Sequence, residues 1–196
     1  MSATRLLVLG VVRMRGQAHG YQVRRELLTW HADKWANVQP GSIYHALKKM
    51  TGEGLLEQVA DEEGVSAGPD RVAYRLTEDG ETEFQVLLGR ALVEEDATGY
   101  SLSAAVTMMT SLPRARAINL LKQQLAHLEA RATSTHYARD HAVEMGQPAH
   151  VAELYQLWSL HAEASVNWIK AMIEHLEAGE YVMAGEGGPA FGEPPE

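Results

Sequence analysis

The chain has 196 residues, 45% of them hydrophobic, and contains no cysteine. This length can bury one good core or two small ones, and the lack of cysteine excludes disulfides, thiolate-bound zinc and thiol nucleophiles. The formal net charge is −9, yet residues 1–50 hold eight Lys or Arg against two Asp or Glu, a local charge of +6. Residues 51–92 hold three against ten, and residues 93–196 hold six against fourteen. The basic charge that a polyanion would need is therefore concentrated in the first quarter of the chain.

The apolar stretch of residues 6–12 predicts a buried helix. It is flanked by Arg5 and Arg13 and is too short to be a transmembrane helix or to read as a signal peptide. No run of 18 apolar residues occurs in the sequence. We therefore expect a cytoplasmic protein without a membrane partner.

Three helices are predicted in the first 50 residues. The first covers residues 4–15 and ends before a glycine. A turn at residues 17–20 leads to the second helix, residues 21–30, and a connection at residues 33–38 leads to the third, residues 39–50. This order is that of a helix-turn-helix unit.

The third helix is the predicted recognition helix. Pro40 suits the first helical turn, and Ile43, Leu47 and Met50 have the i, i+4, i+7 spacing of one buried stripe. The polar side chains then lie on other faces, and the N–H groups of the first turn favour a phosphate that the small Gly41 lets approach. Taken alone, the segment also fits an ordinary amphipathic helix with solvated lysines.

Residues 55–60 and 71–77 predict two strands of a hairpin, the wing, joined by the acidic loop 61–70. A period of two in the second strand predicts that Val72, Tyr74 and Leu76 point inward and that Arg71, Ala73 and Arg75 point outward. Thr77 is expected to cap a further helix that runs to about residue 92, because acidic residues fill its first turn.

The second half is almost wholly helical by pattern. We expect a short apolar helix at residues 100–110 and two long helices, one opening at residues 111–113 and the other covering about residues 150–178, joined by a short turn. Such a hairpin has more apolar surface than it can bury alone, so we expect two chains to associate. From residue 181 to residue 196 the Gly, Pro and Glu content predicts a disordered tail.

The predicted fold class is mainly α. A winged helix-turn-helix DNA-binding domain covers residues 1–92, an α-helical hairpin for dimerisation and effector binding covers residues 93–180, and the tail covers residues 181–196. This division follows from the pattern of predicted elements.

Three groups of residues resemble the PadR family of transcriptional regulators. They are Gly20-Tyr21, Pro40-Gly41-Ser42-Ile43-Tyr44 with Ala46-Leu47, and Tyr74-Arg75-Leu76-Thr77 with Gly80. Their order and spacing over residues 4–92 carry the resemblance, and the C-terminal helices resemble the family's longer variant by pattern and position alone. The resemblance implies a winged-helix repressor that binds operator DNA as a homodimer and is often released by a small molecule such as a phenolic acid. One departure is the acidic loop, where similar members commonly carry basic residues.

The predicted DNA-binding residues come from the second helix, the recognition helix and the wing. They are Tyr21, Gln39, Gly41, Ser42, Tyr44, His45, Lys48, Lys49, Arg71 and Arg75. We expect Tyr44 and Lys48 or Lys49 to contact phosphates, and Ser42 and His45 to approach base edges. A two-fold dimer should select double-stranded operator DNA with an inverted repeat.

The second half also holds candidate ligand-binding residues for a small aromatic effector. They are Met109, Tyr155, Trp158, His161 and Trp168. Aromatic faces with a few polar groups suit such a molecule. The alternative is that these side chains pack in the core of a dimer.

The sequence predicts no enzyme, no cofactor and no metal site. No nucleophile elbow, phosphate loop, dinucleotide fingerprint or HExxH motif occurs, and His136 and His141, five residues apart, lie on different faces of a helix. A second class of function stays open, namely a winged helix that binds other proteins. The basic N-terminal quarter favours DNA.

Overall fold

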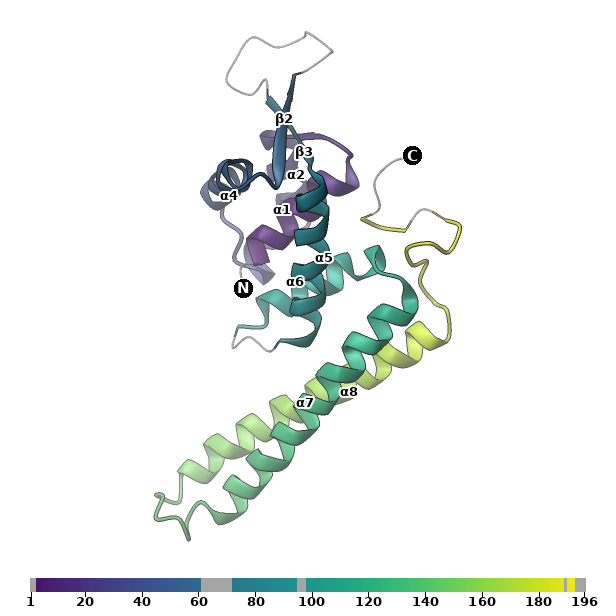
Figure 1. Ribbon diagram of the computed structural model, residues 1–196. Helices are drawn as coiled ribbons and strands as arrows, with labels where there is room; N and C mark the ends of the chain where they lie inside the picture. The colour runs from purple at the N-terminus through teal and green to yellow at the C-terminus, as the bar shows by residue number, and fades with distance from the viewer. Residues whose placement is uncertain (1–2, 61–71, 95–97, 189, 193–196) are drawn as a thin grey trace. The chain divides into compact units, whose positions relative to one another are not determined.

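The computed structural model describes residues 3–60, 72–94, 98–188 and 190–192. The chain divides into two units, which we call unit 1 (Met1–Arg114 with Val182–Glu196) and unit 2 (Ala115–Tyr181). Unit 1 contains short helices and a small sheet, whereas unit 2 is a helical hairpin (Figure 1). The protein is mainly α with a winged-helix N-terminal part, as the sequence predicts.

Unit 1 begins with four helices. They are α1 (Ala3–Met14), α2 (Gly20–Thr29), α3 (Ala32–Trp35) and α4 (Pro40–Gly52). The three helices predicted in this region are confirmed to within two residues, and the single turn α3 is an addition in a segment predicted as a connection. The core helix is α1, since its apolar residues from Leu6 to Val12 are completely buried. Both α2 and α4 pack against it.

The sheet has three antiparallel strands in the order β1-β3-β2. They are β1 (Ala18–His19), β2 (Leu56–Ala60) and β3 (Val72–Leu76). The predicted wing hairpin is confirmed, but β1 lies where the sequence predicts only a turn. The prediction that Ala73 points outward is wrong, because β1 pairs with β3 at this residue and α1 packs on the strand, leaving Ala73 only 3% exposed.

Thr77 and Gly80 join the wing to α5 (Glu78–Val93). The Thr77 hydroxyl accepts a hydrogen bond from the Gly80 N–H (3.0 Å), which caps the helix as predicted, and donates one to the Gly54 carbonyl (2.7 Å). A Cβ on Gly80 would lie 2.0 Å from the Leu55 carbonyl oxygen. Residue 80 therefore has to be glycine for the helix to approach the wing so closely.

The rest of unit 1 packs on α1 and α5. Helix α6 (Tyr100–Met108) continues into the single turn η1 (Met109–Ser111), and both contribute buried side chains. Glycine at residue 10 lets α1 approach α6, because a Cβ there would lie 2.6 Å from the Met108 methyl group. Residues 182–192 also belong to this unit. The sequence predicts disorder there, yet Met183 and Ala190 are buried.

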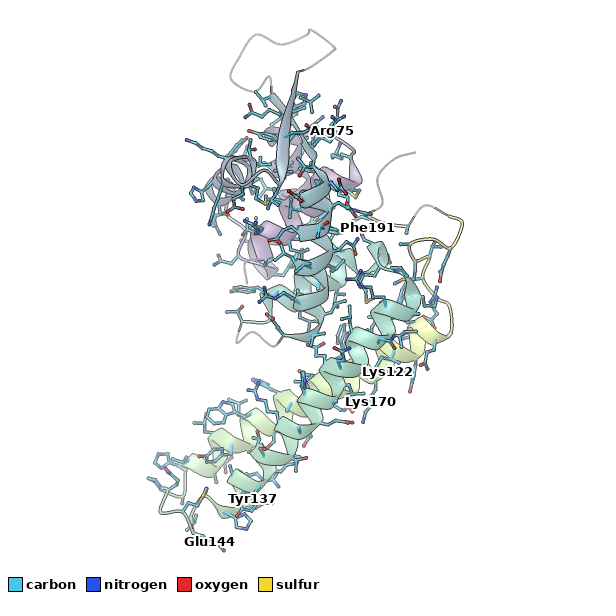
Figure 2. All side chains as sticks on the ribbon, viewed as in Figure 1. Arg75, Lys122, Tyr137, Glu144, Lys170 and Phe191 are labelled. Atoms are coloured by element: carbon cyan, nitrogen blue, oxygen red, sulfur yellow. The ribbon has the colours of Figure 1, made fainter. Side chains whose placement is uncertain are left out.

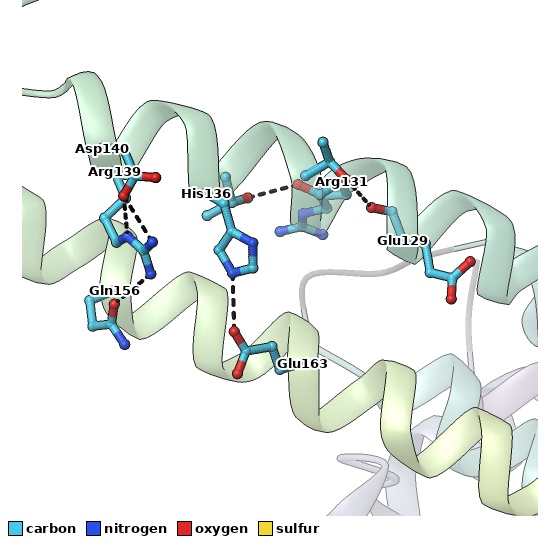
Figure 3. Close-up of polar contacts among 9 residues, drawn as sticks. Glu129, Arg131, His136, Arg139, Asp140, Gln156 and Glu163 are labelled. Atoms are coloured by element: carbon cyan, nitrogen blue, oxygen red, sulfur yellow. Dashed lines mark hydrogen bonds and ion pairs between the residues drawn. The ribbon is translucent and has the colours of Figure 1, made fainter.

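Unit 2 is an antiparallel pair of long helices, α7 (Arg114–His141) and α8 (Val151–Glu177) (Figure 1). Ion pairs and a hydrogen bond join the two helices. They are Lys122–Glu177 (2.8 Å), Lys170–Glu129 (2.7 Å), His136–Glu163 (3.0 Å) and Arg139–Gln156 (3.0 Å). Figure 2 labels Lys122 and Lys170, and Figure 3 shows the contacts of His136 and Arg139 with α8. Arg139 also donates to Asp140 and holds the pKa of that carboxyl below its usual range. Within the described parts of the chain, no helix combines the length and apolar character needed to cross a membrane.

Candidate nucleic-acid interface

Helix α4 divides into a buried and an exposed face, as predicted. Ile43, Leu47 and Met50 are at most 1% exposed. The exposed residues of the helix are Gly41, Tyr44, His45, Lys48, Lys49 and Gly52. The N-cap residue Gln39 is also exposed, and Ser42 is half-buried. The sequence positions the polar side chains because three apolar residues fix the rotation of the helix against the core.

The first turn of α4 is open to its surroundings. Gln39 has the extended conformation of an N-cap residue, but its side chain caps no helical N–H and instead donates to Asn37 (3.4 Å). The Ser42 hydroxyl donates to the Gln39 carbonyl (2.7 Å) and keeps acceptor lone pairs. A Cβ on Gly41 would meet no atom within 4 Å. An anion can therefore approach this turn without displacing any neighbouring side chain.

Helix α2 supplies further side chains beside α4. Tyr21, Arg24 and Arg25 are exposed and, with Leu28 and Thr29, line a shallow surface depression. The two helices pack closely where Gly20 faces Tyr44, since a Cβ on Gly20 would lie 2.8 Å from the tyrosine ring. Our sequence-based site named Tyr21 but missed Arg24 and Arg25. Their position off the buried stripe of Val23 and Leu27 was the signal that could have found them.

Most cations of unit 1 are engaged by carboxylates. The ion-paired residues are Arg5 (with Glu53 and Glu83), Arg13 (Glu81), Arg15 (Glu26), Lys34 (Asp33), Arg75 (Glu57), Arg90 (Glu94) and Arg114 (Glu186). Lys49 forms a longer ion pair with Glu53, with 3.9 Å between Nζ and the carboxylate oxygen. Among the residues of unit 1 that the structure describes, Arg24, Arg25 and Lys48 form no ion pair with a described carboxylate. All three lie on α2 and α4, so the unneutralised positive charge among the described residues of unit 1 lies on these helices.

Residues 8–86, which span most of α1 through much of α5, match the family model described as "Transcriptional regulator PadR-like family". The match covers 79 of the 196 residues, so this N-terminal part of the chain is a PadR-like winged-helix domain, and the matched family is one of transcriptional regulators.

Solved structures of PadR proteins are similar to this chain. PadR from Bacillus subtilis in complex with operator DNA is 20% identical, with 88% of this chain and 98% of that chain covered and a TM-score of 0.40. The same protein in complex with p-coumaric acid is 18% identical, with 89% and 96% covered and a TM-score of 0.38. The PadR-like regulator BC1756 from Bacillus cereus is 19% identical, with 90% and 99% covered and a TM-score of 0.38. A search among curated proteins found no match.

The wing of this PadR-like domain adds little free positive charge. Arg75 is exposed, but its guanidinium pairs with Glu57 directly across the hairpin (2.8 Å). The acidic loop and Arg71 lie outside the described residues. The structure thus places α2 and α4 side by side, whereas the one described wing cation is already neutralised.

Some predicted residues of α4 face α1 instead of α2. Ser42, His45 and Lys49 line a small cavity of about 200 Å³, together with Thr4, Arg5, Ala46 and Met50. Arg5 in this cavity is held between Glu53 and Glu83. The candidate base-contacting residues therefore lie on the α1 side of α4, while Tyr44 lies on the α2 side.

The candidate ligand-binding residues belong to both units, and those of unit 2 are spread along α8. Met109 is buried in unit 1. Tyr155 and Trp158 on α8 are in edge-to-face contact, with ring centroids 5.5 Å apart. Trp168 is ten residues further along the same helix, about 15 Å away by the rise of an α-helix, and His161 is exposed between them. Within the described ranges no group of three or more His, Asp or Glu could hold a metal ion.

Proposed function

We propose that this PadR-like regulator is a repressor that binds an inverted-repeat operator as a homodimer. The observation that carries the proposal is the location of Arg24, Arg25 and Lys48. A cation that is free of internal carboxylates is available to neutralise a phosphate, and each such contact releases counterions from the DNA. In this docking, Arg24, Arg25 and Lys48 contact the phosphates together with Tyr44. Ser42 and His45 read base edges in the major groove.

The exposed apolar side of α8 supports dimerisation. Leu154, Leu157, Trp158 and Trp168 are between 37% and 47% exposed, although the helix also buries Ile169 and Ile173 against its own unit. Helix α7 presents mainly polar side chains to solvent, and Tyr137 is its one exposed large hydrophobic residue. Exposed apolar side chains on one side of a helix favour a second copy of the same helix, which buries equivalent side chains on both chains.

In this proposal, the N-terminal and C-terminal parts of the chain have different functions. Residues 1–92 bind DNA, residues 93–180 dimerise and bind an effector, and the protein acts in the cytoplasm. A small aromatic ligand would release the operator by binding the DNA-incompetent state more tightly than the competent one. A tenfold release needs about 1.4 kcal/mol of that difference. The paired rings of Tyr155 and Trp158 supply a surface for such a molecule.

Selection from a random duplex library tests the proposed function. The full-length protein should enrich an inverted repeat whose half-sites have centres about 10 base pairs apart, because a two-fold dimer presents two α4 helices at a fixed separation. The same library passed over the matrix without protein is the control. Equal retention of all sequences would contradict the proposal and favour a winged helix that binds other proteins.

A further inference from the structure

The C-terminal segment, described for residues 182–188 and 190–192, lies against the end of α6 and η1 in unit 1. The Ala184 N–H donates to the Thr110 carbonyl (2.9 Å), and the Thr110 hydroxyl donates to the Phe191 carbonyl (2.7 Å). Met183 is completely buried and Ala190 is 6% exposed. The contacts thus involve both ends of the segment, not a single point.

The end of this segment reaches the C-terminal ends of α1 and α2. The ring of Phe191 (labelled in Figure 2) packs on Trp30, the residue that follows the last turn of α2, with centroids 5.5 Å apart. Arg13, in the last turn of α1, donates to the Gly192 carbonyl and also pairs with Glu81 of α5. One short segment therefore links the ends of the two helices on which α4 packs.

Near its start, the segment is bound to Arg114 by an ion pair. Arg114 donates two hydrogen bonds to the Glu186 carboxylate, at 2.7 and 2.6 Å. The same carboxylate accepts the Met183 N–H (3.1 Å). These interactions hold the pKa of Glu186 below its usual range. The bidentate geometry fixes the loop between residues 183 and 186 to the start of α7.

Gly192 fits this surface because it has no side chain. Its φ is +87°, and a Cβ would lie 2.4 Å from the Ser111 hydroxyl oxygen. Gly185 has a similar φ of +82°, but a Cβ there would meet no atom within 4 Å. Both glycines thus have the left-handed conformation, and only Gly192 is also confined by a neighbouring side chain.

We propose that Arg13, Trp30, Thr110 and Ser111 form a docking site whose occupant is the chain's own residues 182–192, and that this docking supports operator binding. The second step rests on the proposed function. With the site occupied, the ends of α1 and α2 are held together, and α4 keeps its position on them. Release of the segment lowers the fraction of molecules that are competent to bind DNA, and the apparent affinity falls in proportion.

Two full-length variants test the docking. Gly192→Ala places a methyl group against Ser111, whereas Gly185→Ala imposes a similar backbone strain without a clash. In Gly192→Ala we expect the Ala184 amide to lose its protection from hydrogen exchange and operator affinity to fall by about threefold to tenfold, in line with the competent fraction. Gly185→Ala should retain both properties of the wild-type protein. Ser111→Gly combined with Gly192→Ala should restore both properties in part, because it removes the clashing hydroxyl together with the hydrogen bond (3.5 Å) that this hydroxyl donates to the Phe191 carbonyl.

Hydrogen exchange at Ala184 tests the docking, and operator affinity tests its coupling to DNA binding. An Ala184 amide that exchanges in the wild-type protein as fast as in a free peptide would overturn the docking. Lost protection in Gly192→Ala with unchanged operator affinity would overturn the coupling to DNA binding. If the wild-type protein bound no operator, the repressor function and the coupling would fail together, while hydrogen exchange would still report on the docking.

Discussion

Replacing Arg24, Arg25 and Lys48 together by alanine is expected to weaken operator binding by two orders of magnitude or more. These cations are exposed and have no carboxylate partner among the described residues of unit 1, so each is available for a phosphate. Every phosphate contact contributes about 0.9 to the slope of log affinity against log salt. A dimer that lost six such contacts should therefore show a slope lower by about five units. Fluorescence anisotropy of a labelled operator, titrated at several salt concentrations, measures both quantities.

A triple variant of paired cations separates local contacts from net charge. Arg75, Arg90 and Lys170 are exposed and bound to Glu57, Glu94 and Glu129. Replacing these three by alanine changes the net charge of the chain by the same amount. We expect a small loss of affinity and a nearly unchanged salt slope. If both triple variants lost affinity equally, long-range charge would explain binding and the docking through α2 and α4 would be wrong.

The second large effect is expected from Trp168→Glu, which should convert the dimer into a folded monomer. Trp168 is 37% exposed on the apolar side of α8, so the substitution leaves the core of the hairpin intact. In a dimer it would bury a carboxylate without a partner and remove an aromatic contact. We estimate a cost of about 3 kcal/mol or more, a factor of more than about 100 in the dimer dissociation constant. Sedimentation at several concentrations measures this constant.

The adjacent residue provides the matched control. Asn167 is exposed on the same helix, rotated by about 100° from Trp168. Asn167→Glu adds the same charge on a different face, and we expect the dimer to persist. Monomers in both variants would indicate that any negative charge on α8 disrupts association. A stable dimer in Trp168→Glu would show that the two chains do not associate through the apolar side of α8.

The sequence predicts well those elements whose structure depends on residues that are close together in the chain. Pro40 and the spacing of Ile43, Leu47 and Met50 define α4 without any distant residue, and the structure confirms the buried face. Thr77 is predictable as a cap because the acidic residues after it are adjacent in the chain. Residue 80 must be glycine because it lies so close to the Leu55 carbonyl. The resemblance to the PadR family includes Gly80, but it does not reveal this contact.

The features that the sequence analysis missed depend on contacts between distant residues. Strand β1 has two residues and no periodicity, and it exists because it pairs with β3 more than fifty residues later. Arg24 and Arg25 stand out only after the carboxylates that pair with the other cations of unit 1 are known. The composition of residues 182–192 predicts disorder, but buried Met183 and the contact between Phe191 and Trp30 place the segment on unit 1. No local pattern contains this information.

The central claim is that the first turn of α4 lies against DNA, and Gly41→Ala tests it most directly. Gly41 and Gly52 are both in α4, and a Cβ at either position would meet no atom of the protein within 4 Å. Alanine at either site should leave the melting temperature unchanged or raise it, because alanine favours a helix over glycine by up to about 1 kcal/mol. We predict that Gly41→Ala lowers operator affinity by about tenfold, equivalent to about 1.4 kcal/mol, while Gly52→Ala binds like the wild-type protein. Wild-type affinity in a folded Gly41→Ala variant would contradict the claim.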